Sequence, residues 1–200
     1  HVYLLGKVPS PKILLKAFEE VKPNLILTVP LILEKIYKKM ILPQLSKTTM
    51  KVALNIPLLD SRIYAQIRKK LVDAFGGRFR EVIVGGAAMN EEVTNFLYKI
   101  KFPFTIGYGM TECGPLISYD HNDEYVPGSC GQILKGIMKV RIDSEDPYNK
   151  VGEIQVSGEN VMKGYYKNEE ATSKVFTEDG WLRTGDLGTI DADNRIYIRG

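Results

Sequence analysis

The chain has 200 residues, 44% hydrophobic and 26% charged, and its 27 Lys and Arg residues against 24 Asp and Glu residues give a net charge of +3. This balance is ordinary for a globular protein, and without a basic block containing interleaved aromatic residues it does not support a nucleic-acid partner. Two cysteines are too few for a disulfide scaffold or a zinc site, so a reducing compartment such as the cytoplasm is expected. No run approaches the roughly 18 apolar residues expected of a transmembrane segment.

The first half of the chain alternates helical and strand-like patterns with short connections. Four segments carry apolar residues at helical spacing: 11–21, 31–42, 60–75 and 90–100. Three short apolar runs have the length of strands: 25–29, 81–84 and 102–106. The alternation predicts an α/β fold over residues 1–120, with a layered and mostly parallel sheet covered by helices.

Single residues mark the ends of these segments. Ser10 and Asp60 are suited to cap the helices that follow them, because their side chains accept hydrogen bonds from free backbone N–H groups, and Asn90 is expected to start a further helix. Pro43 predicts the end of the second helix. The run 25–29, bounded by Asn and Pro, is interpreted as a strand covered on both faces.

The second half has a different pattern. Three segments alternate polar and apolar residues: 139–143, 153–157 and 195–199. Such alternation is typical of half-solvated antiparallel strands. A turn is expected at 191–194, and one short helix at 169–176. Residues 121–200 are therefore predicted to form a small antiparallel, β-barrel-like subdomain.

The hexapeptide Gly-Tyr-Gly-Met-Thr-Glu at 107–112 is the most informative motif. Its glycines let a backbone approach a ligand closely, its tyrosine offers a flat face, and Thr111 places a hydroxyl beside the Glu112 carboxylate. It follows a predicted strand, and ligands of open α/β sheets bind beyond the carboxyl ends of strands. These groups indicate a nucleotide with its Mg²⁺. A core tyrosine beside a solvated glutamate is the structural alternative.

Two further stretches have the same double interpretation. Gly-Gly-Ala-Ala at 85–88 lets a flat ring lie against the backbone, or it is simply a tight strand-to-helix turn. Residues 184–186, Thr-Gly-Asp, are predicted to form a turn whose carboxylate accepts hydrogen bonds from both hydroxyls of a ribose, or a polar hairpin turn without a ligand. Trp181 is interpreted as a core residue.

Taken together and in this order, the stretches resemble the acyl-adenylate-forming, AMP-binding enzymes, which include acyl-CoA synthetases, nonribosomal adenylation domains and luciferases. The signatures that carry the resemblance lie at 107–112, 152–158, 161–166 and 181–187. Two further segments look like the long-chain fatty acid–CoA ligase branch: 22–37 and 75–80. The resemblance spans nearly the whole chain.

The resemblance implies a set of ATP- or AMP-binding residues: Gly86, Ala87, Ala88, Gly107, Tyr108, Gly109, Met110, Thr111 and Asp186. In such enzymes the position of Tyr108 stacks on adenine, and that of Asp186 holds the ribose hydroxyls. The resemblance further implies that Thr111 contacts the α-phosphate and that Glu112 binds Mg²⁺. Thr111 and Glu112 are the expected catalytic residues.

The implied reaction has two steps and uses a fatty acid, ATP, Mg²⁺ and coenzyme A. The fatty acid carboxylate attacks the α-phosphate, giving acyl-adenylate and pyrophosphate, and coenzyme A then displaces AMP. Mg²⁺ and aligned donors offset the repulsion between the two anions. A cytoplasmic protein is expected. Peripheral membrane contact is compatible with an insoluble substrate, although no basic amphipathic helix marks it.

The family's phosphate loop would lie before residue 1, and its hinge Arg and the C-terminal domain with the adenylation Lys would follow Gly200. The chain is therefore expected to be the second half of the large N-terminal domain and inactive alone, with subdomains 1–120 and 121–200 ending at the hinge. Two alternatives stay open: a ligase for an aryl, short-chain or amino acid, and a non-catalytic nucleotide-binding module. A third interpretation, a purely structural α/β scaffold, would require the three matched motifs to have arisen by chance.

Overall fold

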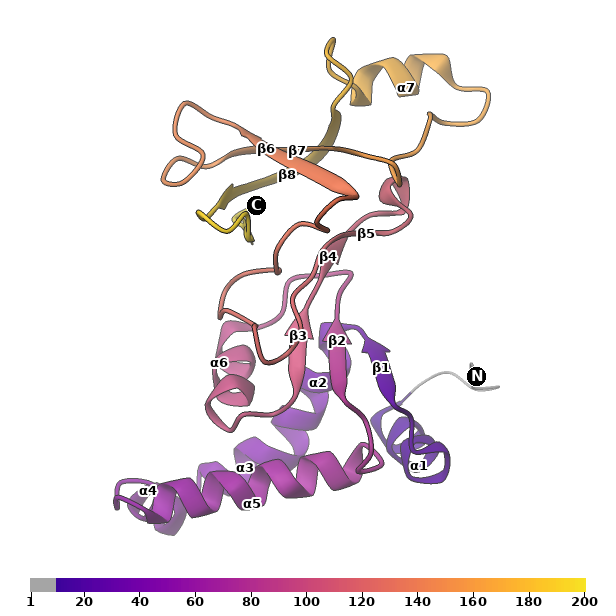
Figure 1. Ribbon diagram of the computed structural model, residues 1–200. Helices are drawn as coiled ribbons and strands as arrows, with labels where there is room; N and C mark the ends of the chain where they lie inside the picture. The colour runs from indigo at the N-terminus through magenta and orange to yellow at the C-terminus, as the bar shows by residue number, and fades with distance from the viewer. Residues whose placement is uncertain (1–9) are drawn as a thin grey trace. The chain divides into compact units, whose positions relative to one another are not determined.

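The computed structural model describes residues 10–200, which form two compact units, one ending at Phe104 and the other spanning Thr105–Gly200. The fold is mixed α/β, with a parallel sheet in the first unit and antiparallel strands in the second (Figure 1). The subdomain boundary predicted at 120/121 lies inside the second unit. The part of the predicted α/β subdomain before Ser10 lies outside the described residues.

The first unit alternates helices with short strands, as the sequence predicts. Its elements are α1 (Pro11–Val21), β1 (Leu25–Thr28), α2 (Pro30–Ile36), the π-helix η1 (Tyr37–Ile41), α3 (Leu42–Leu45), α4 (Thr48–Ala53), α5 (Leu59–Ala74), β2 (Glu81–Val84) and α6 (Glu91–Lys99), and β3 (Phe104–Ile106) begins at its last residue. The strands have the order β1-β2-β3 in one sheet, and β1 and β2 are parallel.

The predicted cap at Ser10 is confirmed, and the helix predicted to start at Asn90 begins there, with Asn90 as its N-cap. The Ser10 hydroxyl accepts a hydrogen bond from the Ile13 N–H at 3.4 Å, and the Asn90 amide oxygen accepts one from the Val93 N–H at 3.3 Å. Each bond satisfies one of the backbone donors left free in the first turn. Capping is local, which is why the sequence predicts it.

The predicted cap at Asp60 is wrong. Helix α5 begins one residue earlier, at Leu59, and its N-cap is Leu58 with a φ of 70° and no side-chain capping bond. Asp60 lies in the first turn, where its carboxylate accepts the Ser61 N–H at 2.6 Å. An acidic residue is favourable there because the helix dipole is positive at this end, so the same residue type suits both positions.

The predicted helix end before Pro43 is also wrong. The backbone widens into η1 after α2 and continues as α3, with Pro43 in the first turn of that helix. Proline has no N–H and its ring clashes with the carbonyl four residues earlier. A π-helical turn before the proline accommodates both effects, so the helical path continues past Pro43.

Strand β1 is covered on one face in the described residues, so the prediction of a doubly covered strand is wrong. Ile26 is 4% exposed, whereas Leu25 and Leu27 are 50% and 73% exposed. Successive side chains of a strand point to opposite faces, and β1 lies at the edge of its sheet. The neighbouring β2 is buried as predicted, with Val82 and Val84 inaccessible.

An aromatic cluster lies where α1 meets the C-terminal end of α5. Phe75 stacks on Phe18 with a centroid separation of 5.3 Å and contacts Phe79 and Phe102 at 5.9 and 5.6 Å. The chain then reverses at Gly76, whose φ is 94° and where a Cβ would lie 2.4 Å from the Phe18 carbonyl oxygen. This close approach requires glycine, and it lets α1 pack against the end of α5.

The second unit is built from antiparallel strands. Its elements are β4 (Tyr108–Gly109), the 3₁₀ turn η2 (Thr111–Cys113), β5 (Leu116–Ser118), β6 (Met138–Asp143), β7 (Gly152–Gly158), α7 (Glu169–Val175), β8 (Leu182–Ile190) and β9 (Ile196–Ile198). β4 pairs with β5, and β6-β7-β8-β9 form a curled sheet that makes half of a barrel (Figure 1). The predicted antiparallel strands, the short helix and the turn at 191–194 are confirmed.

Strand β8 contradicts the prediction of a turn at 184–186. Arg183 and Leu187 pair with residues of β7 that are only two positions apart, so 184–186 lie opposite the single residue Ile154. Gly185 has a φ of 78°, which a strand tolerates at a bulge. A bulge and a hairpin turn use the same residue types, because both need a glycine with positive φ.

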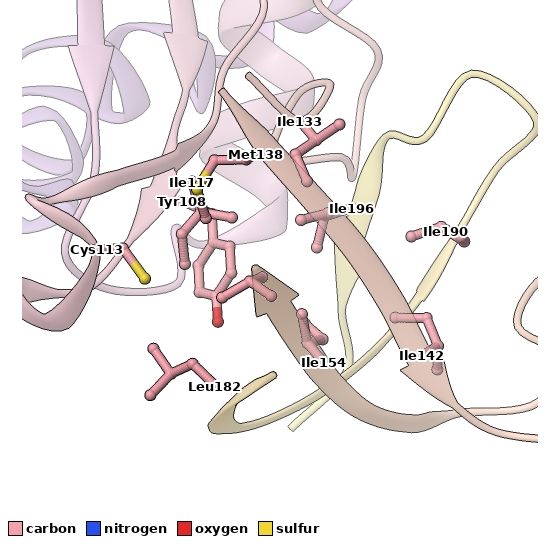
Figure 2. Packing of buried hydrophobic residues seen from close by; sticks show 11 residues of the cluster. Tyr108, Cys113, Ile117, Ile133, Met138, Ile142, Ile154, Leu182, Ile190 and Ile196 are labelled. Atoms are coloured by element: carbon pink, nitrogen blue, oxygen red, sulfur yellow. The ribbon is translucent and has the colours of Figure 1, made fainter. Parts of the chain in front are cut away.

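The core of the second unit gathers side chains from nearly all its strands (Figure 2). Its buried members are Tyr108, Cys113, Ile117, Ile133, Met138, Ile142, Ile154, Val156, Leu182, Ile190 and Ile196. Trp181 does not belong to this set, so its interpretation as a core residue is wrong. Its indole ring is partly exposed, with the Arg141 guanidinium 4.6 Å from the ring centroid.

Among residues 10–200, no helix is both long and apolar enough to cross a membrane.

Candidate functional site

Tyr108 and Asp186 lie 78 positions apart in the sequence, and the fold brings them into direct contact. The Tyr108 hydroxyl donates a hydrogen bond of 2.6 Å to Asp186 Oδ2. The ring is 8% exposed and packs within the core of the second unit (Figure 2). Burial, followed by the bond to Asp186, holds the pKa of Tyr108 well above its usual range. The phenol therefore remains a proton donor at ordinary pH.

The bulge in β8 fixes the position of Asp186. The Thr184 hydroxyl donates to the Ile154 carbonyl of β7 at 2.8 Å and accepts the Asp186 N–H at 3.1 Å. The extra residues of the bulge turn the Asp186 carboxylate, which is only partly exposed, toward Tyr108. Asp186 is thus held both by backbone contacts within its own strand and by the phenol of Tyr108, which is far away in the sequence.

A tight loop presents Thr111 and Glu112. Met110 donates its N–H to the Pro115 carbonyl at 2.9 Å, which closes the loop around the 3₁₀ turn. At Gly109 a Cβ would lie 2.0 Å from that same carbonyl oxygen, so the two segments approach at a distance that only glycine permits. Thr111 is exposed and Glu112 is half-buried.

Glu112 is held by the segment that follows β7. The Tyr165 hydroxyl donates to Glu112 Oε1 at 2.9 Å, and the Met162 N–H donates to the Glu112 carbonyl at 2.7 Å. The bond to the carboxylate raises the pKa of Tyr165, which is 37% exposed. Sequence reasoning missed Tyr165 as a site residue, although it lies within the 161–166 signature.

Asn160 connects the same two segments. Its side-chain amide donates to the carbonyl oxygens of Cys113 and Leu116, at 2.6 and 2.9 Å. These bonds satisfy backbone acceptors of the loop that carries Glu112. A partly buried amide that bridges two carbonyls restricts a loop more than one bond would. No sequence pattern indicates this contact, because an isolated asparagine has no distinctive neighbours.

Few protein side chains near Glu112 could bind a divalent cation. Within residues 10–200, no three or more His, Cys, Asp or Glu side chains gather as a metal site. Glu112 offers one carboxylate, of which Oε1 bonds to Tyr165. Mg²⁺ commonly uses one or two carboxylates together with water and substrate phosphates. The single acid therefore fits a Mg²⁺ that arrives with a nucleotide.

The remaining predicted site residues lie in both units. Gly86, Ala87 and Ala88 follow β2 in the first unit and are exposed, and Gly86 has a φ of 84°. In the second unit, Gly107 is buried between β3 and β4, and Met110 packs against the core.

Residues 1–166 match the family model described as AMP-binding enzyme. The chain belongs to this family, as its motifs predict. Its fold resembles that of ATP-bound MatB from Rhodopseudomonas palustris, with a TM-score of 0.69 at 26% identity over 98% of this chain and 34% of that structure.

Two curated relatives differ in the acid that their names state. 4-Coumarate-CoA ligase 1 of Narcissus pseudonarcissus is 36% identical over 155 residues, which cover 71% of this chain and 28% of the relative. Long-chain-fatty-acid–CoA ligase 1 of Saccharomyces cerevisiae is 29% identical over 197 residues, which cover 90% of this chain and 28% of the relative. The chain thus spans just over a quarter of the length of either relative, and the long-chain branch stays a prediction.

Proposed function

We propose that the chain provides the adenosine and metal subsites of an ATP-dependent acid–CoA ligase. The observation that carries the proposal is the 2.6 Å contact between Tyr108 and Asp186, because it joins the aromatic residue of one family motif to the acid of another. Both groups suit a nucleoside: a carboxylate accepts from a vicinal diol, and a tyrosine provides an apolar ring beside it.

Each site residue has a role in this proposal. Asp186 accepts the ribose hydroxyls, and Tyr108 contributes to the nucleoside subsite. Thr111 donates its exposed hydroxyl to the α-phosphate. Glu112 holds Mg²⁺, which would neutralise phosphate charge when bound. The family resemblance adds Gly86, Ala87 and Ala88, exposed small residues of the first unit that would let a nucleotide approach the backbone, and the buried Gly107 as the neighbour that positions Tyr108.

The two steps of the reaction place different demands on these groups. First, a carboxylate oxygen of the acid forms a bond to the α-phosphorus while the bond to pyrophosphate breaks. The coenzyme A thiolate then attacks the acyl carbon, and AMP leaves with the electron pair of the broken C–O bond. Thr111 assists the first step by stabilising charge on the α-phosphate, and Asp186 keeps the nucleoside in place during both.

Two classes of carboxylic acid are candidates for the substrate. The segments 22–37 and 75–80 favour a long-chain fatty acid, because they resemble that branch of the family. The 36% identity to a 4-coumarate-CoA ligase favours an aromatic acid instead. We propose the fatty acid because the yeast relative aligns over 90% of the chain, against 71% for the Narcissus relative.

ATP–pyrophosphate exchange by the complete protein tests both parts of the proposal. Oleate is expected to support exchange faster than 4-coumarate, acetate or any amino acid, and Asp186→Asn should raise the KM for ATP. Faster exchange with 4-coumarate would select the aromatic candidate. Nucleotide binding without exchange for any acid would leave only a non-catalytic module, and absence of adenine nucleotide binding would refute the proposal.

A further inference from the structure

We propose that Tyr108 is a positioning residue for ribose recognition, which acts by holding the Asp186 carboxylate in the orientation that receives a vicinal diol. The inference rests on the proposed function, because the diol is that of a bound adenine ribonucleotide. It assigns to the phenol hydroxyl a role separate from any contact of the ring with the base.

The geometry of the carboxylate supports this assignment. Oδ2 of Asp186 accepts the Tyr108 hydroxyl at 2.6 Å, and within residues 10–200 no hydrogen bond reaches Oδ1. A carboxylate has about four lone-pair sites, so one bond from a phenol leaves room for both hydroxyls of a diol. The terminal torsion of an aspartate is broad, and a bond to one oxygen narrows it before the ligand arrives.

The phenol is a suitable anchor because it is itself held firmly. Its ring is 8% exposed among buried side chains of the core, including Cys113 and Leu182. Its backbone belongs to β4, in which Tyr108 pairs with Ser118 of β5. A donor fixed by packing positions its acceptor more accurately than a donor on a free side chain.

The acid is restrained from the opposite side as well. Thr184 bonds both to β7 and to the Asp186 N–H, so the bulge fixes the Asp186 backbone while Tyr108 fixes the carboxylate. The burial that raises the pKa of Tyr108 also keeps its hydroxyl protonated, so the donor persists at every pH at which such an enzyme works.

Tyr108→Phe tests the inference because it removes one oxygen and keeps the ring. Exchange is measured in the complete protein with ATP and with 2′,3′-dideoxy-ATP, which lacks the diol. The KM for ATP should rise roughly fivefold to tenfold with kcat nearly unchanged, as expected for loss of one hydrogen bond. The KM for the dideoxy nucleotide should stay near the wild-type value, so the preference for ATP falls by the same factor.

Two further variants separate positioning from general damage. In the Asp186→Asn background, Tyr108→Phe should add little to the loss of preference, because the two groups act together. Tyr197→Phe is the matched control: it removes a tyrosine–aspartate bond of 3.1 Å to Asp191, and the preference for ATP should not change. Thermal unfolding verifies that each variant is folded.

An unchanged preference in folded Tyr108→Phe would overturn the inference. Equal losses with both nucleotides would do the same, because they would place the effect in the base contact or in the fold. A wild-type protein that binds no adenine nucleotide would instead refute the proposed function, so the two failures are distinguishable.

Discussion

The two acids of the candidate site are held in different ways. Asp186 lies in a strand bulge and accepts a hydrogen bond from Tyr108, whose ring is buried in the core. Glu112 lies in a 3₁₀ turn and accepts a hydrogen bond from Tyr165, which is 37% exposed. A buried donor fixes an acid permanently, whereas an exposed donor can be replaced by water or by a ligand at little cost.

This difference suits the two proposed roles. A ribose subsite gains affinity when its acceptor is already oriented, because less freedom is lost on binding. A metal ligand must instead adjust as the cation and the phosphates arrive together, and a carboxylate held by an exposed phenol can do so. The comparison therefore predicts large effects where the backbone or the acid itself changes, and smaller effects where one phenol is removed.

Gly109→Ala should have the largest effect on stability. The new Cβ would lie 2.0 Å from the Pro115 carbonyl oxygen, so the pairing of β4 with β5 and the loop that carries Glu112 must shift. We expect a loss of about 3 kcal/mol or more, measured by denaturant unfolding. Gly136→Ala is the control: its φ of 77° disfavours alanine, but nothing lies within 4 Å of the new Cβ, so this variant should cost only about 1 kcal/mol. Equal losses would show that the close approach at Gly109 is unimportant.

Glu112→Gln should have the largest effect on catalysis. The amide keeps the size of the side chain but loses the charge that holds Mg²⁺ near the α-phosphate. Turnover in the exchange assay should fall roughly 100-fold, while the affinity for the acid changes little, because the metal acts mainly on the transition state. The measurement is kcat in exchange beside acid binding by calorimetry. Equal kcat for the variant and the wild type would remove Glu112 from the mechanism.

The sequence predicts which residues belong to the candidate site, and their roles stay predictions, but it does not predict the contacts between them. The motif at 107–112 and the acid at 186 were predicted from local residue types and the family resemblance. The 2.6 Å bond between Tyr108 and Asp186 depends on how β4 lies relative to β8, and no local pattern contains that information. For the same reason Tyr165 was missed, since its role comes from a contact across 53 positions.

The fold shows the same division between local and distant causes. The sequence predicts the cap at Ser10 and the helix start at Asn90 because both depend on hydrogen bonds that span three residues. Pro43 does not end the helix, because the π-helix η1 precedes it and continues into α3. No residue type marks a π-helix in the sequence. The sequence predicts a turn instead of the bulge at 184–186, because the strand pairing on both sides, and not the residue types, distinguishes the two.

Tyr108→Phe should have a moderate effect on stability. Removing a buried donor to a carboxylate should cost about 1.5 kcal/mol in unfolding free energy near neutral pH. The pKa of Tyr108 is raised on folding, so its contribution is fully present below about pH 10, where unfolded tyrosine is protonated, and declines as the pH rises above it. The decline of wild-type stability in alkaline buffer should therefore be shallower in the variant, as urea titrations from pH 8 to 11 would reveal. A parallel decline in both proteins would contradict the assignment.

Tyr165→Phe should have the smallest effect, and it tests the comparison most directly. The lost bond to Glu112 is exposed, and water can replace the phenol, so unfolding free energy should change by less than about 0.5 kcal/mol. The Mg²⁺ concentration needed for half-maximal exchange should shift by less than about threefold, because the carboxylate itself remains. A shift as large as that caused by Glu112→Gln would mean that Tyr165 orients Glu112 as firmly as Tyr108 orients Asp186. The two acids would then be held alike, and the exposed contact would have to be as ordered as the buried one.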